Sequence, residues 1–260
     1  VYYPSDLQPQ ETEILRFEDR ETGDCTVQPH FDYPHAYLAD LPSKLTATGV
    51  GRGYRADEAA EETPPPRKEV QLRAPLFEQG EKKLTPAEIG TAHHLFMQFC
   101  DFDAACAPNG VENELNRLAE KKILSTEQAH AVDKRKIERF FASDLYKTFM
   151  AENKVRREFK FSVLVPAQAY FPVAADAPEE NVLLQGVIDC LIETRDGFVI
   201  LDFKTDRIKK GGAVERAEQY RPQLAAYARA VHEIYGRPVR ACVLYFFHTG
   251  DTEWVSLDED

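Results

Sequence analysis

The spacing of apolar residues along the chain predicts helices first and strands afterwards. Thr85-Pro86-Ala87-Glu88 has the residue types of a helix N-terminus, with Thr as N-cap, Pro at the first helical position and Glu at the third. We expect this helix to run to about Asp101. A second capping box, Ser125-Thr126-Glu127-Gln128, predicts a helix that carries Val132, Ile137, Phe140 and Phe141. A further helical piece is expected from Asp144 to about Asn153.

From Phe159 onward the apolar residues follow the period of strands. Apolar Phe159, Phe161, Val163 and Val165 alternate with polar Glu158, Lys160 and Ser162, which predicts a strand with one polar face. Asn181–Glu193 and Phe198–Phe203 predict two more strands, joined by the hairpin signal Thr194-Arg195-Asp196-Gly197. The remaining elements are a helix from about Pro222 to Tyr235 with a stripe of Leu224, Tyr227, Val231 and Ile234, a strand Val239–Phe247, and a short strand Glu253–Val255.

Residues 1–83 differ from the rest in having many prolines, few periodic apolar segments and an acidic run from Asp57 to Glu62. This composition predicts an extended, partly disordered connector, with residues 52–75 the most mobile. Gly49, Gly51 and Gly53 lack the GK[ST] ending of a phosphate-binding loop, so they favour a flexible loop. The boundary with an ordered domain, residues 84–260, is therefore expected at Leu84. The first residue is Val rather than Met, so we expect a fragment of a longer protein.

The net charge and the cysteine pattern disfavour several classes of protein. The net charge of −12 disfavours tight, independent binding to nucleic acid, although a cleft can still concentrate positive potential. Five cysteines without a CxxC pair favour a reducing cytoplasm over a disulfide framework. Their spacing is wrong for an iron–sulfur cluster, and Cys100 and Cys106 only weakly suggest zinc. No membrane-spanning segment or secretion signal is expected.

Three charged residues are expected to meet on the predicted hairpin. If Arg195-Asp196 forms the loop, Asp189 faces Asp202, and if Asp196-Gly197 forms it, Asp189 faces Lys204. Asp202 and Lys204 share a face because they are two apart in a strand. A buried Asp–Lys ion pair without chemistry would explain one carboxylate but not the second. Two carboxylates among apolar neighbours favour a site for a hard divalent cation, Mg²⁺ or Mn²⁺, beside an amine.

Several motifs resemble those of RecB-like nucleases in the PD-(D/E)XK superfamily. Gly186-Val187-Ile188-Asp189 and Leu201-Asp202-Phe203-Lys204-Thr205-Asp206 resemble the GxID…DYKTD signature. Gly90-Thr91-Ala92-His93-His94 resembles the upstream GTxxH motif, and Tyr220, Gln223 and Tyr227 resemble YxxQxxxY. The resemblance implies an α/β fold with a restriction-endonuclease-like core, a central mixed sheet flanked by helices, behind an irregular N-terminal extension.

The resemblance extends upstream of these motifs. Tyr33-Pro34-His35 and Leu41-Pro42-Ser43-Lys44-Leu45 are similar to the connector before the nuclease domain of AddA-type helicase–nuclease proteins. This implies an exonuclease that acts in double-strand break repair and recombination, on DNA ends that are single-stranded. The implied partners are the helicase portion of the same chain and an AddB-type second subunit. No G-x-x-x-x-G-K-[ST] occurs, so this chain is not itself the ATP-driven part.

The same resemblance implies roles for individual residues. His94, Asp189, Asp202 and the backbone carbonyl of Phe203 would bind metal, Lys204 would be the catalytic lysine, and Glu158 would be a further acidic residue of the catalytic site. Tyr220, Gln223 and Tyr227 would contact DNA or support the site. Phe203 replaces the common Tyr of DYKTD, which leaves the backbone ligand possible.

Simpler explanations stay open for several of these residues. Helical period places His93 with Ile89, Phe96 and Cys100, which favours a packed core histidine. Glu158 could be a surface ion pair, and Tyr227 could be explained by packing alone. Arg207, Lys209 and Lys210, with Arg216, could hold a phosphate backbone or form a solvated turn. The alternative function is a catalytically weak nuclease-like module that binds DNA or serves in subunit docking.

Overall fold

The computed structural model of the chain describes residues 36–39, 41–50 and 84–257. Ala36–Leu38 form a 3-10 helix, η1, which belongs to a separate unit from residues 40–260. All further elements lie in this second unit. The expected mobile segment 52–75 and the connector motif Tyr33-Pro34-His35 lie outside the described residues.

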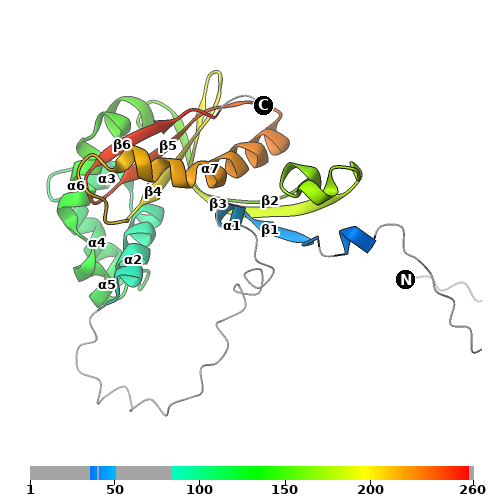
Figure 1. Ribbon diagram of the computed structural model, residues 1–260. Coiled ribbons are helices and arrows are strands. Elements are labelled where there is room, and N and C mark those ends of the chain that lie inside the picture. Colours follow the sequence, from blue (N-terminus) through cyan, green and yellow to red (C-terminus); the bar gives the residue numbers. More distant parts are fainter. Residues whose placement is uncertain (1–35, 40, 51–83, 258–260) are drawn as a thin grey trace, which may run out of the picture. The chain divides into compact units, whose positions relative to one another are not determined.

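A mixed six-stranded sheet forms the centre of the fold (Figure 1). Its strands are β1 (Lys44–Thr46), β2 (Lys154–Pro166), β3 (Asn181–Thr194), β4 (Gly197–Lys204), β5 (Val239–Phe246) and β6 (Asp251–Val255). The order is β1-β3-β4-β5-β6, and β2 pairs with β3. The β1–β3 and β4–β5 pairs are parallel and the others are antiparallel. The expected α/β class with a central mixed sheet is confirmed.

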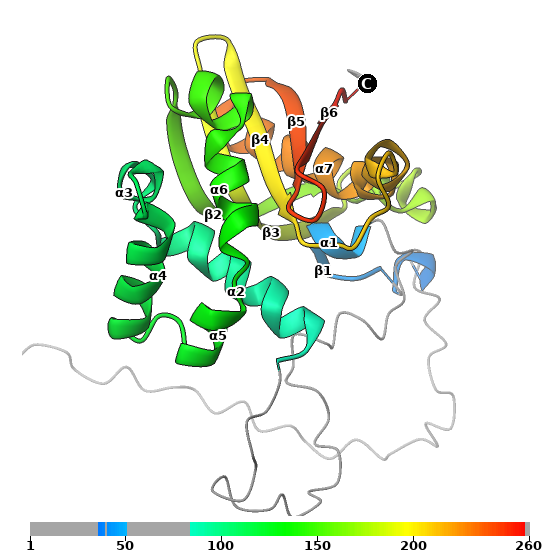
Figure 2. The same ribbon diagram turned by 90° about the vertical axis from the view of Figure 1, so that its left-hand side faces the viewer.

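Helices pack against both faces of this sheet because β4 is apolar on both sides. Val199, Leu201 and Phe203 join a core with helices α2 (Pro86–Phe99), α4 (Gly110–Glu120), α6 (Lys134–Ala142) and the π-helix η4 (Leu145–Met150). Phe198 and Ile200 join a second core with α1 (Ala47–Val50) and α7 (Ala213–Tyr235). Figure 2 shows α6 in front of the sheet and α7 behind it. Short helices α3 (Phe102–Cys106), α5 (Thr126–Ala131), η5 (Ala167–Ala169) and η6 (Pro172–Ala174) complete the described elements.

Both expected capping boxes are present. Thr85 and Glu88 exchange side-chain and backbone hydrogen bonds at the start of α2, and Ser125 and Gln128 do so at α5. One continuous helix was expected after Ser125, but the structure has two. The first, α5, ends at Ala131, and the second, α6, begins after Asp133. The reason is that Asp133 accepts from the N–H of Arg135 and becomes the N-cap of α6.

The helix expected from Pro222 begins nine residues earlier, so the predicted start was wrong. α7 runs from Ala213 to Tyr235 with Pro222 in its interior, and Gly236 ends it with a left-handed φ of 61°. An interior proline removes one helical hydrogen bond. Burial of Ala213 and Ala217 against the sheet stabilises the extra turns. Ile234, expected on the buried stripe, is 41% exposed.

Part of the expected connector belongs to the sheet. β1 pairs with β3 from Lys44 to Thr46, and Leu45 and Ala47 are buried in the α7-side core. A Cβ at Gly186 of β3 would lie 2.6 Å from the Phe161 ring and 3.2 Å from Ala47, so glycine permits this close packing. The boundary at residue 84 stays a prediction, because residues 51–83 are outside the described part.

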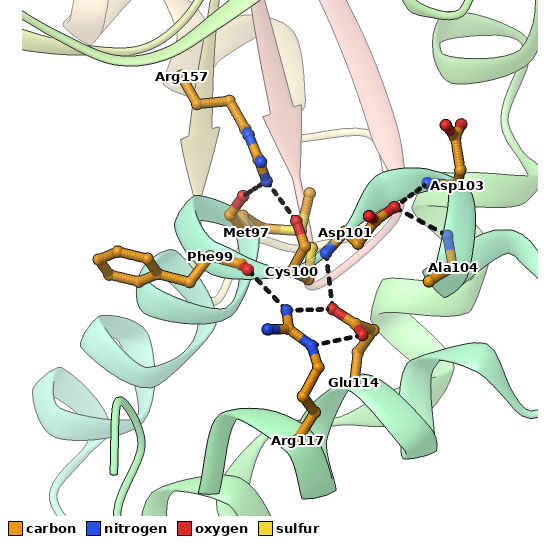
Figure 3. Close-up of polar contacts among 9 residues, drawn as sticks. All are labelled: Met97, Phe99, Cys100, Asp101, Asp103, Ala104, Glu114, Arg117 and Arg157. Atoms are coloured by element: carbon orange, nitrogen blue, oxygen red, sulfur yellow. Dashed lines mark hydrogen bonds and ion pairs between the residues drawn. The ribbon is translucent and has the colours of Figure 1, made fainter. Parts of the chain in front are cut away.

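A partly buried ion pair of α4, between Arg117 and Glu114, also bonds to the end of α2 (Figure 3). Arg117 donates to both carboxylate oxygens of Glu114, at 2.7 and 2.6 Å, and to the carbonyl of Phe99 at the end of α2. Glu114 also accepts from the N–H of Asp101, and only 4% of the residue is exposed. The Arg117 guanidinium holds the pKa of Glu114 below its usual value. This network fixes the end of the helix that carries His94.

Arg117→Ala should lower the free energy of unfolding by about 3 kcal/mol, because Glu114 would be left buried without its counter-charge. The matched control is Arg221→Ala. Arg221 makes the same (i, i+3) contact with Glu218 and also donates to a carbonyl, that of Ser256, but its pair is exposed. This change should cost less than about 1 kcal/mol. Urea denaturation measures both, and equal costs would contradict the assigned role of Glu114.

Among the described residues, no helix is both long and apolar enough to span a membrane.

Candidate active site

A gap in the pairing of β3 creates the site. β2 covers one edge of β3 from Asn181 to Glu193, so β1 and β4 must share the other edge. β1 pairs with residues 183–185 and β4 with residues 190–194. The segment 186–189 between them has no strand on that edge among the described residues. Asp189 lies at the end of this gap.

The register of the β3–β4 hairpin brings two carboxylates together. Thr194 pairs with Gly197 and Cys190 with Leu201, so Arg195-Asp196 is the loop and Asp189 stands opposite Asp202. This is the first of the two registers considered from the sequence. Asp189 Oδ2 accepts from the N–H of Phe203 at 2.7 Å, which holds the carboxylate against the end of β4.

Glu158 and His94 come to the same place from other elements. Arg157 pairs with Cys190 and Phe159 with Ile188, so Glu158 stands opposite Asp189 across β2 and β3. Glu158 has a φ of 49° and interrupts the pairing there. Burial and the charge of Asp189 raise the pKa of Glu158. His94 Nδ1 lies 3.5 Å from Asp189 Oδ1, and although burial lowers its pKa, the contact with Asp189 outweighs this and raises it.

Asp202 is the most buried acid of this cluster. Its residue exposure is 4%, and burial raises its pKa to about 6, against the lowering effect of Lys204. The Nζ of Lys204 lies 2.7 Å from Asp202 Oδ2, so the amine contacts this buried oxygen as an ion pair. A buried carboxylate is costly unless an opposite charge lies beside it, and Lys204 supplies that charge.

Two side chains of α7, Tyr220 and Gln223, contact the amine of Lys204. Lys204 Nζ donates to Gln223 Oε1 at 3.3 Å and lies 3.8 Å from the centre of the Tyr220 ring. Gln223 Nε2 donates to the hydroxyl of Tyr227 at 2.7 Å. Gln223 and Tyr227 are buried, and Gln223 connects Lys204 to Tyr227.

Sequence reasoning gave no role to Asp206, which holds Tyr220 in place. The hydroxyl of Tyr220 donates to Asp206, and Arg216 donates to the other oxygen of that carboxylate at 3.2 Å. Burial, with this hydrogen bond, raises the pKa of Tyr220 to about 12. The sequence feature that could have indicated a role for Asp206 is its position at the end of the motif Asp202-Phe203-Lys204-Thr205-Asp206.

The donors present fit a hard divalent cation. The candidates are carboxylate oxygens of Asp189 and Asp202, whose side chains are 14% and 5% exposed. No three His, Cys, Asp or Glu side chains of the described segments are already arranged as a metal-binding group. Lys204 instead lies 2.7 Å from Asp202, and His94 lies 3.5 Å from Asp189. Oxygen donors of this kind suit Mg²⁺ or Mn²⁺.

Arg207, Lys209 and Lys210, the basic residues expected to contact DNA, are exposed on the loop between β4 and α7.

His93 is buried, as its helical position predicted. Its Nδ1 contacts the carbonyl of Ile89, and its Nε2 accepts from the N–H of Asp133 at 3.3 Å, so it joins α2 to the start of α6.

The part of the chain that carries this site is similar to known proteins. The family model of the PD-(D/E)XK nuclease superfamily matches residues 67–256. An ATP-dependent helicase/nuclease protein of Moorella thermoacetica is 40% identical over 88% of this chain and 17% of that protein. The ATP-dependent helicase/nuclease proteins of Desulforamulus reducens and Desulforudis audaxviator are 38% and 36% identical, each over 85% of this chain and 18% of the relative.

The chain thus spans less than a fifth of the length of these curated relatives. The crystal structure of SSO0001 matches with a TM-score of 0.31 and 12% identity, over 70% of this chain and 71% of that one, which is too weak to carry an argument. The family match includes α2, β2, both strands of the hairpin and α7, the five elements that supply the site. The chain belongs to the PD-(D/E)XK nuclease superfamily.

Proposed function

We propose that this chain hydrolyses phosphodiester bonds of DNA with Mg²⁺ or Mn²⁺. The observation that carries this is the convergence of Asp189, Asp202 and Lys204 at the gap in β3, with the Lys204 amine 2.7 Å from the buried carboxylate of Asp202. A module retained only for docking would have no reason to keep two carboxylates and an amine buried together at a cost in folding free energy.

Each residue has a role that its contacts support. Asp189, Asp202 and the carbonyl of Phe203 would hold the metal, with His94 as a further ligand. When bound, the metal would polarise the scissile phosphate and lower the pKa of a water molecule. Lys204 would donate to a phosphate oxygen or orient the attacking water, since its amine is held beside Asp202 by Gln223 and Tyr220. Glu158 would contribute charge next to Asp189.

The wider context is proposed from the relatives. We infer that the chain is the nuclease part of an AddA-type protein, fed with single-stranded ends by a motor in the same full-length chain. The same proposal includes a role in recombinational repair, exonuclease action in the cytoplasm, and pairing with an AddB-type second subunit. Arg207, Lys209 and Lys210 would contact the DNA backbone from their exposed loop.

The direct test is cleavage of 5′-labelled single-stranded DNA by the whole chain, with Mn²⁺, with Mg²⁺ and with a chelator. We expect shortening of linear DNA with a divalent ion and none with the chelator. Circular single-stranded DNA in parallel separates exonuclease from endonuclease action. A chain that is folded by circular dichroism and cuts neither substrate with either ion would refute the proposal.

Gln223 and Tyr227 were expected to contact DNA or support the site, and their burial favours support. Gln223→Ala should lower kcat about tenfold and leave KM for DNA within about twofold, because it loosens Lys204 without removing a DNA contact. Arg207→Ala, on the exposed loop, should instead raise KM. Steady-state kinetics on one oligonucleotide measures both, and a Gln223 variant changed only in KM would show a DNA contact after all.

A further inference from the structure

A second hollow adjoins the candidate active site. It is a cavity of about 410 Å³ lined by four segments that are far apart in the sequence. These are the first turns of α2 up to His93, Lys136 of α6, Thr205 to Arg207 after β4, and Phe247 with His248 after β5. Thr205 directly follows Lys204, and Gly90 lies one helical turn before His94. The cavity therefore begins where the active-site cluster ends.

Direct contacts hold these four segments in place. A Cβ at Gly90 would lie 2.8 Å from Thr205 Oγ1, so glycine lets α2 touch the loop after β4. The N–H of Phe247 donates to the carbonyl of Lys204 at 2.9 Å, which joins the ends of β4 and β5. Figure 2 shows the turn after β5 next to the end of β4.

The helical side of the cavity is fixed in the same way. Arg139 of α6 donates to the carbonyls of Phe247 and His248, at 2.7 and 3.3 Å. His93 bridges α2 to the start of α6 through Asp133. The cavity walls are thus connected by hydrogen bonds before any ligand arrives, which lowers the entropy cost of binding.

The charges that face this cavity favour an anion. Lys136 and Arg207 line it with His248, and the acid that lines it is Asp206. The carboxylate of Asp206 is already occupied by Arg216 and Tyr220. Lys136 makes one loose ion pair, 3.7 Å from Asp133 with both side chains about a third or more exposed, and such a pair contributes little. In a chain with a net charge of −12, a basic hollow beside the candidate catalytic residues is a local exception.

We propose that this cavity binds a backbone phosphate of the DNA strand, next to the phosphate that is cut. Lys136 and Arg207 supply the charge, and His248 supplies a ring N–H. The inference rests on the proposed nuclease function and extends it, because Lys136 and His248 come from elements that carry none of the motif residues. It also explains how an acidic chain can retain a polyanion near its own carboxylates.

The test is fluorescence anisotropy of a labelled single-stranded oligonucleotide, titrated with the whole chain over a range of salt concentrations. A chelator prevents cleavage during the titration. The double variant Lys136→Ala/Arg207→Ala should bind about tenfold or more weakly, and the slope of log K against log salt should decrease by about 1–2. The matched control is Arg135→Ala/Arg195→Ala, which makes the same change in net charge. Arg135 is the exposed neighbour of Lys136 on α6, and Arg195 is in the β3–β4 turn.

The control should keep the slope of the wild-type chain and bind within about twofold of it. Equal slopes for the two double variants would overturn the proposed phosphate site, as would an absence of measurable DNA binding by the wild-type chain at low salt. The binding titration does not depend on catalysis, because the chelator prevents cleavage. A chain that shows the predicted slopes but cuts no DNA with Mn²⁺ would keep this binding site and lose the proposed nuclease function.

Discussion

Asp202→Ala and Lys204→Ala should each lower the rate of metal-dependent DNA cleavage by about a thousandfold or more. Asp202 provides a buried carboxylate to the proposed metal, and Lys204 provides the amine beside it. The rate is measured on labelled single-stranded DNA with Mn²⁺. Full activity in both variants would reject the assignment of the site.

The two variants should differ in metal binding, which separates the two roles. Titration calorimetry should show that Asp202→Ala and Asp189→Ala lose Mn²⁺ binding. Lys204→Ala should keep it, because removing the amine removes a competing positive charge 2.7 Å from Asp202. Loss of Mn²⁺ binding in the Lys204 variant would show that the lysine acts on the metal site rather than on the phosphate.

Matched substitutions control for net charge and for folding. Asp144→Ala and Lys147→Ala remove the same charges at the exposed start and side of η4. Both should cleave at the wild-type rate within about twofold. A comparable loss in these controls would mean that the assay reports global electrostatics or stability and not the candidate site.

The parts of this fold that depend on neighbouring residues were predictable from the sequence. The capping boxes at Thr85 and Ser125 satisfy backbone groups within three residues, so the local residue types suffice. The hairpin turn limits the β3–β4 register to two choices, because loop length fixes strand pairing. Within that limit the approach of Asp189 to Asp202 and Lys204 followed from strand alternation alone.

Features that depend on contacts between residues far apart in the sequence could not be predicted from local residue types. β1 joins the sheet through pairing with Gln185 and its neighbours, about 140 residues later in the chain, and three residues carry too little pattern to show it. The start of α7 was misplaced because Pro222 is a strong local signal that tertiary burial overrides. The contacts of Asp206 with Tyr220 and Arg216 depend on where the helix lies against the loop, which no spacing rule gives.

Asp202→Asn should stabilise the metal-free chain while it removes activity. The carboxyl group of Asp202 has its pKa raised from an ordinary value of 3.8 to about 6. Keeping this group ionised at pH 7 therefore costs the folded state free energy. Asparagine has the same shape without the charge. In a chelator the melting temperature of the variant should therefore be higher than that of the wild-type chain.

The raised pKa of Asp202 should also make the stability of the chain depend on pH. A carboxyl group with a higher pKa in the folded chain binds more protons when folded, so the free energy of unfolding falls as the pH rises from about 4 to about 6 or 7. Glu158 and His94 also have raised pKa values, and stability from each is likewise lost as pH rises through its folded value. In Asp202→Asn most of this slope should disappear. Asp196→Asn, in the exposed turn, should leave it unchanged.

Bound metal should make the wild-type chain more stable than the Asp202→Asn variant, the reverse of their order without metal. Mn²⁺ that binds only the folded wild-type chain stabilises it by mass action, by about 2.7 kcal/mol at one hundred times the dissociation constant. The Asn variant lacks the second carboxylate and should gain little. Thermal melts of both proteins with chelator and with millimolar Mn²⁺ should therefore cross, with the variant more stable in the first condition and the wild type in the second. Parallel melts in both conditions would show that the buried charge of Asp202 is not held for a cation.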